Sequence, residues 1–253
     1  MPTKDTEPTP LVGSPTFEEW DFEGLAPHHA TRDEANDRRL IARRKLLGLA
    51  KDVAKRAKPL GVALDVRSSL HNPNKFNGKR VNRLWSYAMR AKAEKTRLRK
   101  IVGADLAKDL NSAYRNAYLC CAIEHDALEV SLRVHPDAWF DGQNLVHRTR
   151  AEGVRPWLDL LNALDGFQLR MHDWRGEWRC GSLTAEKLEE FLGYYTPGEH
   201  RLSIERRWPA PSGSRGPVLA DGVPQAMVEE SLRLLPLYRY MVWSQESDFL
   251  FAR

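Results

Sequence analysis

The sequence predicts an α+β protein: an N-terminal basic helical region, a mostly antiparallel sheet built of two strand-strand-helix units, and a C-terminal helix. Apolar residues recur at helical spacing before residue 60, and from about Tyr118 their period changes to two. A pattern of strand, strand and helix then occurs twice between residues 118 and 207. We therefore expect a flexible acidic tail over residues 1–30, the basic helical region over 31–116 and an α+β domain over 117–253.

The first 30 residues contain five prolines and no sustained periodicity, which predicts a flexible tail. Within this tail, Trp20 and Phe22 alternate with acidic residues. Such a segment either docks on the basic surface of a protein partner or packs on its own domain. The composition leaves both alternatives open.

A long helix is expected from Thr31, which has the capping-box spacing to Glu34, to about Lys58. Its predicted buried side consists of Leu46, Leu49, Ala50, Val53 and Ala57, which recur at helical spacing. Its predicted exposed side carries a basic stripe, formed by Arg44, Lys51, Lys55 and Lys58. The stripe is a candidate binding surface for an anion.

The next segment is predicted to be a loop over residues 71–80, because Asn-Pro and Asn-Gly steps follow one another there. A second helix is expected over residues 81–101, since Val81, Trp85 and Ala88 have helical spacing. A third, shorter helix is expected over residues 104–113, after Gly103.

Strands are predicted from strict alternation of apolar and polar residues. Residues 119–125 and 128–134 form a hairpin, a loop follows over 136–153, and Pro156 begins a helix that ends at Gly166. The unit recurs with strands from Phe167 to Cys180 and a helix capped by Thr184. A strand over 201–206 and a helix from Pro224, interrupted at Pro236, complete the chain.

Positive charge is concentrated in one part of the sequence. Residues 38–100 hold twenty Lys and Arg against three acids, a net charge of +17, whereas both flanks are acidic. Segregation of this size favours an anionic partner. The candidate nucleic-acid-binding residues are the basic stripe and the bases of the loop and second helix: Arg44, Lys51, Lys55, Lys58, Lys75, Lys79, Arg80, Arg83 and Arg90.

The leading hypothesis is a non-enzymatic protein that binds DNA or RNA through this basic region. The first alternative is a subunit of a larger assembly whose basic arm contacts an acidic protein. We expect a cytoplasmic location, because the N-terminus resembles no targeting signal and no apolar stretch reaches the roughly 20 residues that a membrane span requires.

The second alternative is a metal-dependent nuclease that uses Asp126 and Glu129. Ser131 stands where such a site needs a lysine, and the two acids are too close in sequence, so solvated hairpin acids are the favoured interpretation. The spacing of Cys120, Cys121, Cys180 and the histidines does not favour zinc, and these thiols are expected to be reduced and buried. The sequence therefore predicts no cofactor and no metal.

A last candidate site is an anion-binding cluster on the polar face of the sheet. Arg133, Arg170 and Arg201 occupy polar positions on three separate predicted strands. If these strands are neighbours, the three guanidinium groups suit capture of a phosphate or carboxylate. The alternative is three surface arginines paired with Glu129 and Glu205.

Overall fold

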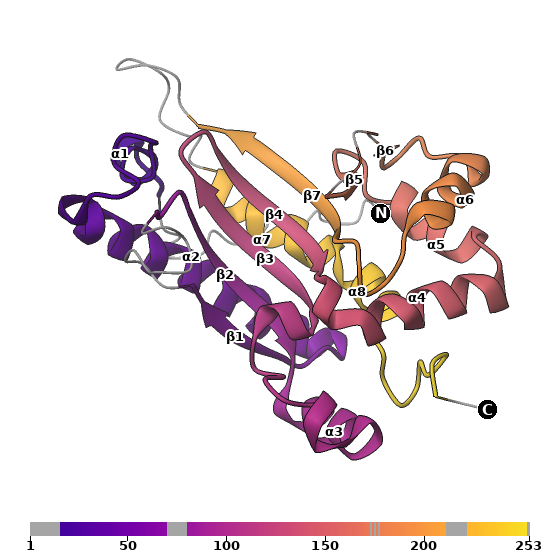
Figure 1. The fold of residues 1–253 in the computed structure, drawn as a ribbon. Coiled ribbons are helices and arrows are strands. Elements are labelled where there is room, and N and C mark those ends of the chain that lie inside the picture. Colours follow the sequence, from indigo (N-terminus) through magenta and orange to yellow (C-terminus); the bar gives the residue numbers. More distant parts are fainter. Residues whose placement is uncertain are drawn as a thin grey trace, which may run out of the picture.

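The computed structural model describes residues 16–69, 80–172, 174, 176, 178–210 and 222–251. Within these ranges, seven antiparallel strands form one sheet in the order β1-β2-β3-β4-β7-β5-β6, and helices accompany it (Figure 1). The predicted α+β class is confirmed. None of the helices in these ranges is long and apolar enough to span a lipid bilayer.

The strands alternate with the helices in an order close to the predicted one. Their bounds are β1 (Leu64–Ser68), β2 (Arg83–Arg90), β3 (Ala117–Glu124), β4 (Ala127–Val134), β5 (Gln168–Met171), β6 (Trp178–Arg179) and β7 (Leu202–Pro209). The first four strands follow one another across the sheet, but β7 lies between β4 and β5. Strand β7, the last of the seven in the sequence, is therefore an interior strand of the sheet, with a paired strand on each side.

The helices are α1 (Glu19–Glu23), α2 (Asn36–Ala57), α3 (Lys92–Leu106), α4 (Trp139–Glu152), α5 (Arg155–Asn162), α6 (Ala185–Tyr194), α7 (Val223–Arg233) and α8 (Leu235–Met241). Pro156 lies in the first turn of α5, and the Thr184 side chain accepts a hydrogen bond from the N–H of Lys187 at the start of α6. The C-terminal helix is interrupted between α7 and α8, and Pro236 lies in the first turn of α8.

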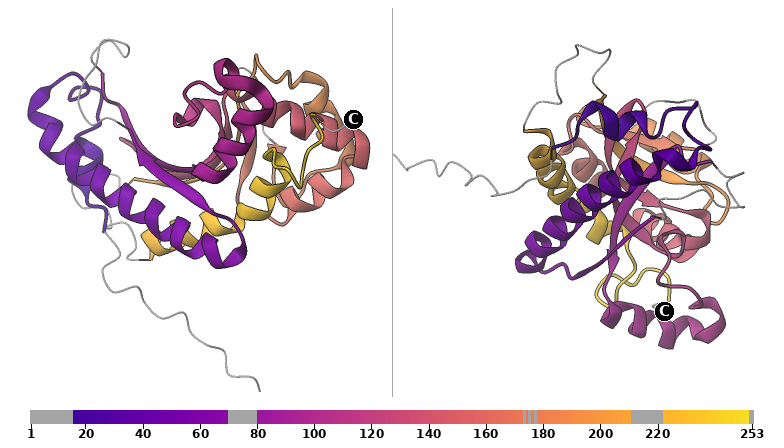
Figure 2. Two further views of the ribbon diagram at one scale, coloured as in Figure 1. Left: turned by 90° about the horizontal axis from the view of Figure 1, so that it is seen from below. Right: turned by 90° about the vertical axis from the view of Figure 1, so that its left-hand side faces the viewer.

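One face of the sheet is covered by helices and apolar. Because side chains alternate along a strand, Leu84, Leu119, Val130 and Ile204 point to the same side, and all are buried. Leu46, Leu49 and Val53 of α2 belong to the same core. Figure 2 shows α2 and α7 on this side of the curved strands and α3 on the other. We call the two sides the covered face and the open face.

The helix predicted over residues 81–101 is wrong in its first half, where β2 pairs with β1 and β3. The inward positions of β2 include Ser86 and Ala88, small residues that weaken the apolar alternation typical of a strand. Strand β1 is short and half-buried, so its pattern is equally weak. The strands before and after residue 117 thus share one sheet.

Three further predictions need correction. The helix predicted over 104–113 is much shorter than expected: it follows a kink at Gly103, whose φ is 83°, as the last part of α3 and ends at Leu106. The loop predicted over 136–153 contains α4, where Asp141 and Asn144 are buried and interrupt the apolar period. The first long helix, α2, begins at Asn36 rather than at Thr31, after a 3₁₀ turn.

The described part of the predicted tail is folded. Phe17, Phe22 and Leu25 are at most 3% exposed and belong to the main core. Trp20 is half-buried, with the Lys45 ammonium 4.9 Å from its ring centre. Phe22 is therefore not available to a protein partner, and the alternative in which this segment packs on its own domain is correct for residues 16–30.

Candidate functional site

The open face of the sheet is polar, in contrast to the covered face. Its side chains come from the alternate positions of five strands: Arg83, Tyr118, Glu124, Glu129, Ser131, Arg133, Arg170, Ser203, Glu205 and Arg207. The sequence pattern of β3, β4 and β7 places these residues outward whenever their apolar neighbours point to the core.

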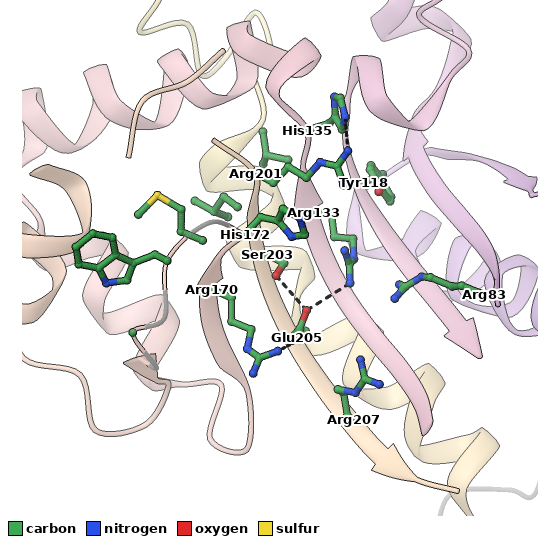
Figure 3. A pocket seen from close by; sticks show the side chains of 15 residues that line it. Arg83, Tyr118, Arg133, His135, Arg170, His172, Arg201, Ser203, Glu205 and Arg207 are labelled. Carbon is green, nitrogen blue, oxygen red and sulfur yellow. Dashed lines mark hydrogen bonds and ion pairs between the residues drawn. The ribbon is translucent and has the colours of Figure 1, made fainter. Parts of the chain in front are cut away.

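A hollow of about 520 Å³ lies on this face (Figure 3). The three predicted anion-binding residues, Arg133, Arg170 and Arg201, all line it. They converge because β7, which begins just after Arg201, lies between β4 and β5. The structure thus brings together three arginines that are up to 68 residues apart in the sequence.

Glu205 holds two of these arginines in place. Its carboxylate lies 3.3 Å from Nη2 of Arg133 and 2.9 Å from Nη1 of Arg170, and it accepts a hydrogen bond from Ser203. Glu205 is 6% exposed. The predicted alternative of carboxylate pairing therefore also occurs, and an incoming anion would share these guanidinium groups with Glu205.

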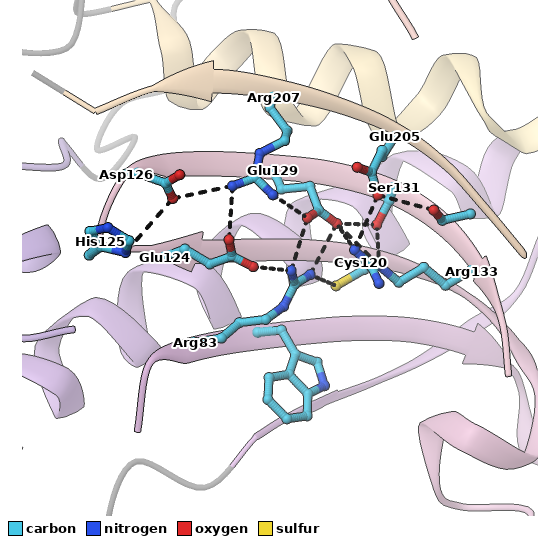
Figure 4. A network of polar contacts seen from close by, with 12 residues as sticks. Arg83, Cys120, Glu124, His125, Asp126, Glu129, Ser131, Arg133, Glu205 and Arg207 are labelled. Atoms are coloured by element: carbon cyan, nitrogen blue, oxygen red, sulfur yellow. Dashed lines mark hydrogen bonds and ion pairs between the residues drawn. The ribbon is translucent and has the colours of Figure 1, made fainter. Parts of the chain in front are cut away.

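Glu129 is the centre of a second, more buried network (Figure 4). It is 1% exposed and accepts hydrogen bonds from both terminal nitrogens of Arg83, at 2.9 and 3.0 Å, from Arg133 at 2.6 Å and from Ser131 at 2.6 Å. Burial alone would raise the pKa of Glu129, but the charges of Arg83 and Arg133 outweigh it and hold the pKa well below its usual range. Glu129 is therefore ionised.

Arg207 connects this network to the tip of the β3–β4 hairpin. It lies 2.8 Å from Glu124 and 3.2 Å from Asp126, and Glu124 also pairs with Arg83. Burial opposes ionisation of Glu124, but these guanidinium groups hold its pKa below the ordinary value. The arginines and carboxylates of the open face therefore alternate and largely neutralise one another.

His135 and Arg201 make a different kind of contact at the edge of the hollow. The backbone N–H of Asp137 donates to Nδ1 of His135, and Nε2 of the same ring lies 3.1 Å from Nη2 of Arg201. Both ring nitrogens thus face N–H groups, and a neutral imidazole accepts at only one of its nitrogens. Burial, together with the charge of Arg201, lowers the pKa of His135, so the ring is neutral near pH 7.

An exposed aromatic pair lies beside the hollow. Trp174, which lines the hollow, stacks on Tyr194 with ring centres 4.3 Å apart and ring planes 25° from parallel. The two residues are 43% and 44% exposed. Two large aromatic side chains that remain this accessible offer a flat apolar surface to a ligand.

The basic stripe of α2 lies on the other side of the molecule. Arg44, Lys51, Lys55 and Lys58 are exposed, while the residues of the predicted buried side are all buried against the covered face. The stripe therefore points away from the sheet and from the hollow. The structure does not bring these four residues together with Arg133, Arg170 and Arg201.

The other predicted nucleic-acid-binding residues fall into three groups. Arg83 belongs to the Glu129 network, and Arg90 is 2% exposed and paired with Asp141 in the interior, so Arg90 cannot contact a polymer. Arg80 is exposed. Lys75 and Lys79 lie outside the described residues.

Helix α3 forms one border of the open face. Nζ of its Lys95 lies 2.8 Å from Asp65, which points to the open side of β1. The remaining bases of α3 are exposed, and they are Lys92, Arg97, Arg99 and Lys100. The part of the +17 segment that lies on the side of the open face is therefore Arg83, which lines the hollow, together with α3, and not α2.

The acids considered for a nuclease are engaged by arginines. Glu129 is surrounded by Arg83 and Arg133, and Asp126 lies beside Arg207. Guanidinium groups in these positions compete with a metal ion for the carboxylates. Cys120, Cys121 and Cys180 are buried free thiols, and burial is the main cause that raises the pKa of each.

Three residues of the site were missed in the sequence. Arg207 alternates with Ser203 and Glu205, so the period of two could have identified it. Trp174 and Tyr194 belong to different elements and carry no local signal of their contact.

No protein-family model matches this chain, and a comparison with curated proteins found no match either.

Proposed function

We propose that this protein binds single-stranded nucleic acid, DNA or RNA, on the open face of its sheet, as a binding protein without a chemical step. The observation that carries the proposal is the convergence of Arg133, Arg170 and Arg201, which lie on three separate segments of the chain, on one hollow. Guanidinium groups gathered in this way suit bidentate capture of phosphate oxygens.

Arg133 and Arg170 support the same assignment. Glu205 fixes both guanidinium groups beside the hollow, so they need little reordering when an anion arrives. The exposed bases of α3 add positive charge along the border of the open face. A ligand with several phosphates in a row would contact both the arginines of the hollow and the bases of α3.

The aromatic pair favours single strands over duplexes. A base stacks on an aromatic ring only when its own flat face is free, and bases in a duplex are already stacked on one another. Trp174 and Tyr194 lie close enough to the arginines of the hollow to combine stacking with phosphate contacts.

The test is fluorescence anisotropy of labelled 12-nucleotide DNA and RNA, single-stranded and duplex, titrated with the full chain at several salt concentrations. Single strands should bind more tightly than duplexes, and affinity should fall as salt rises. Absence of binding to every probe at low salt would overturn the proposal.

A matched pair of variants locates the site. Arg170→Gln with Arg201→Gln removes two charges from the hollow, and Lys51→Gln with Lys55→Gln removes two from the basic stripe of α2. We expect the first to weaken single-strand binding about tenfold or more and to reduce the salt slope by about 0.7 for each lost phosphate contact. The second should change affinity less than threefold. The reverse result would assign binding to the stripe.

The position of the basic stripe, on the side of the molecule opposite to the hollow, favours a second candidate function. In this alternative the stripe contacts an acidic protein surface within a larger assembly. Poly-L-glutamate is a suitable probe: binding that Lys51→Gln with Lys55→Gln weakens, in a chain that does not bind oligonucleotides, would favour this alternative.

A further inference from the structure

A second cluster of chemically active side chains lies far from the hollow in the sequence, in the turn between α1 and α2. Oε1 of Glu23 lies 2.9 Å from Nε2 of His28 and 3.3 Å from Nε2 of His29. The three ligand atoms all lie within 4.8 Å of one another. Two imidazole nitrogens and one carboxylate oxygen thus converge on one point.

The turn that carries this cluster is held by a buried arginine of α2. Arg39 is 0% exposed and donates from Nε to the carbonyl of Gly24, from Nη1 to that of Arg32 and from Nη2 to that of His29. Three backbone points between residues 24 and 32 are therefore fixed by one side chain. The two histidines project from a backbone that does not need to be ordered by a ligand.

The two distances from Glu23 to the histidines are compatible with a shared metal ion. Ligands bound tetrahedrally to zinc at about 2.0–2.1 Å lie about 3.4 Å from one another. The Glu23–His29 distance of 3.3 Å is already at this value, and the Glu23–His28 distance of 2.9 Å is close to it. Imidazole with carboxylate is a donor set that zinc accepts readily, with further positions left for water or an external ligand.

We infer that Glu23, His28 and His29 form a binding site for a divalent metal ion of the zinc type, with three protein ligands and an open coordination position. The site fastens the end of α1 to the turn that follows it. The segment before it contributes Phe17 and Phe22 to the core, so metal binding stabilises the attachment of residues 16–32.

The inference does not depend on nucleic-acid binding, because the cluster shares no residue with the hollow. An ion pair between Glu23 and protonated histidines is the competing explanation of the same contacts. The two explanations differ in one measurable respect, which is whether a metal ion binds to the cluster.

Isothermal titration calorimetry of the full chain with zinc chloride at pH 7.5 tests the site. We expect one equivalent to bind, and a rise in the unfolding temperature when zinc is present. His28→Ala and His29→Ala should each weaken binding about tenfold or more, and Glu23→Gln should weaken it as well. His125→Ala, which removes an exposed histidine next to Asp126, is the matched control and should leave binding unchanged.

Circular dichroism of each variant checks that the fold is kept. Two results would overturn the inference: no saturable zinc binding to the wild-type chain, or binding that survives in the doubly substituted His28→Ala and His29→Ala chain. The second result would place zinc elsewhere, and the ion pair would then explain the cluster.

Discussion

The two faces of the sheet each bury a carboxylate, but they do so in different ways. On the helix-covered side, Asp141 is 0% exposed and accepts hydrogen bonds from the backbone N–H groups of Ala117 and Trp243 as well as from Arg90. On the open side, Glu129 is held by side chains of the sheet itself, Ser131 and Arg133 of its own strand and Arg83 of β2. Asp141 joins distant segments of the chain, whereas Glu129 organises one surface.

The two carboxylates also differ in how accessible their arginine partners are. The donors around Asp141 are buried, with Arg90 2% exposed, so they have no access to water or ligand. The arginines around Glu129 have side chains 22% and 25% exposed, so they are fixed on one side and accessible on the other. A buried acid under accessible arginines is a way to orient cations toward a ligand.

The largest effect is expected for Asp141→Asn. The substitution leaves Arg90 buried without a countercharge, and an uncompensated buried charge costs about 3–5 kcal/mol. Urea unfolding followed by circular dichroism measures the loss. A loss smaller than that of Glu129→Gln would contradict the distinction between the two faces.

Glu129→Gln should cost less, about 2–3 kcal/mol, because water can reach the arginines that lose their partner. Asp126→Asn is its control on the same hairpin. The Asp126 side chain is 56% exposed, and its pair with Arg207 should contribute less than about 1 kcal/mol. Equal losses in the two variants would show that the Glu129 network is not buried in solution.

The pH dependence of stability should also distinguish Glu129. Because the folded protein holds the pKa of this group below its usual 4.5, its contribution is present above that pH and is lost as pH falls toward the folded pKa. Between pH 5 and pH 3 the wild-type chain should lose about 1.5 kcal/mol more than Glu129→Gln. Urea unfolding at several pH values tests this, and parallel curves would contradict it.

Trp174→Ala should weaken the proposed binding to single strands by about 1–3 kcal/mol, the usual value of one stacked base. An abasic oligonucleotide with the same number of phosphates is the control, and its affinity should not change. Anisotropy titrations measure both. Equal losses with the two probes would mean that Trp174 supports the hollow rather than a base.

The smallest expected effect concerns His135. Burial and then Arg201 lower its pKa in the free chain, and a bound phosphate would favour the protonated ring, so affinity should rise as pH falls. We expect a rise of about threefold from pH 7.5 to pH 5.5, which His135→Gln should abolish. An unchanged pH profile in the variant would remove His135 from the site.

Regular periodicity made much of the fold predictable. Local patterns predict the β3–β4 hairpin and the helix starts at Pro156 and Thr184. They also predict which residues form β7, although not its place in the sheet. The outward positions of Arg133 and Arg170 follow from the same alternation. These predictions succeeded because each depends on neighbours within a few residues.

The remaining features depend on distant partners. Ser86 and Ala88 lie in a strand because β1 and β3 pair with it on both sides. Asp141 can be buried in α4 because donors from three other segments hydrogen-bond to its carboxylate. The meeting of Arg201 with His135 requires the strand order of the sheet, which no local pattern contains. The sequence alone therefore identified Arg133, Arg170 and Arg201 of the hollow but not Arg207, and it did not show how these arginines are arranged.

The central position of β7 has a consequence for synthesis. Strands β4 and β7 pair residues 127–134 with residues 202–209, so the middle of the sheet cannot close until most of the chain has left the ribosome. Arg201 and Arg207 reach the hollow only at that moment. A nascent or truncated chain ending before residue 202 therefore does not display the complete hollow, which forms only after β7 has been synthesised.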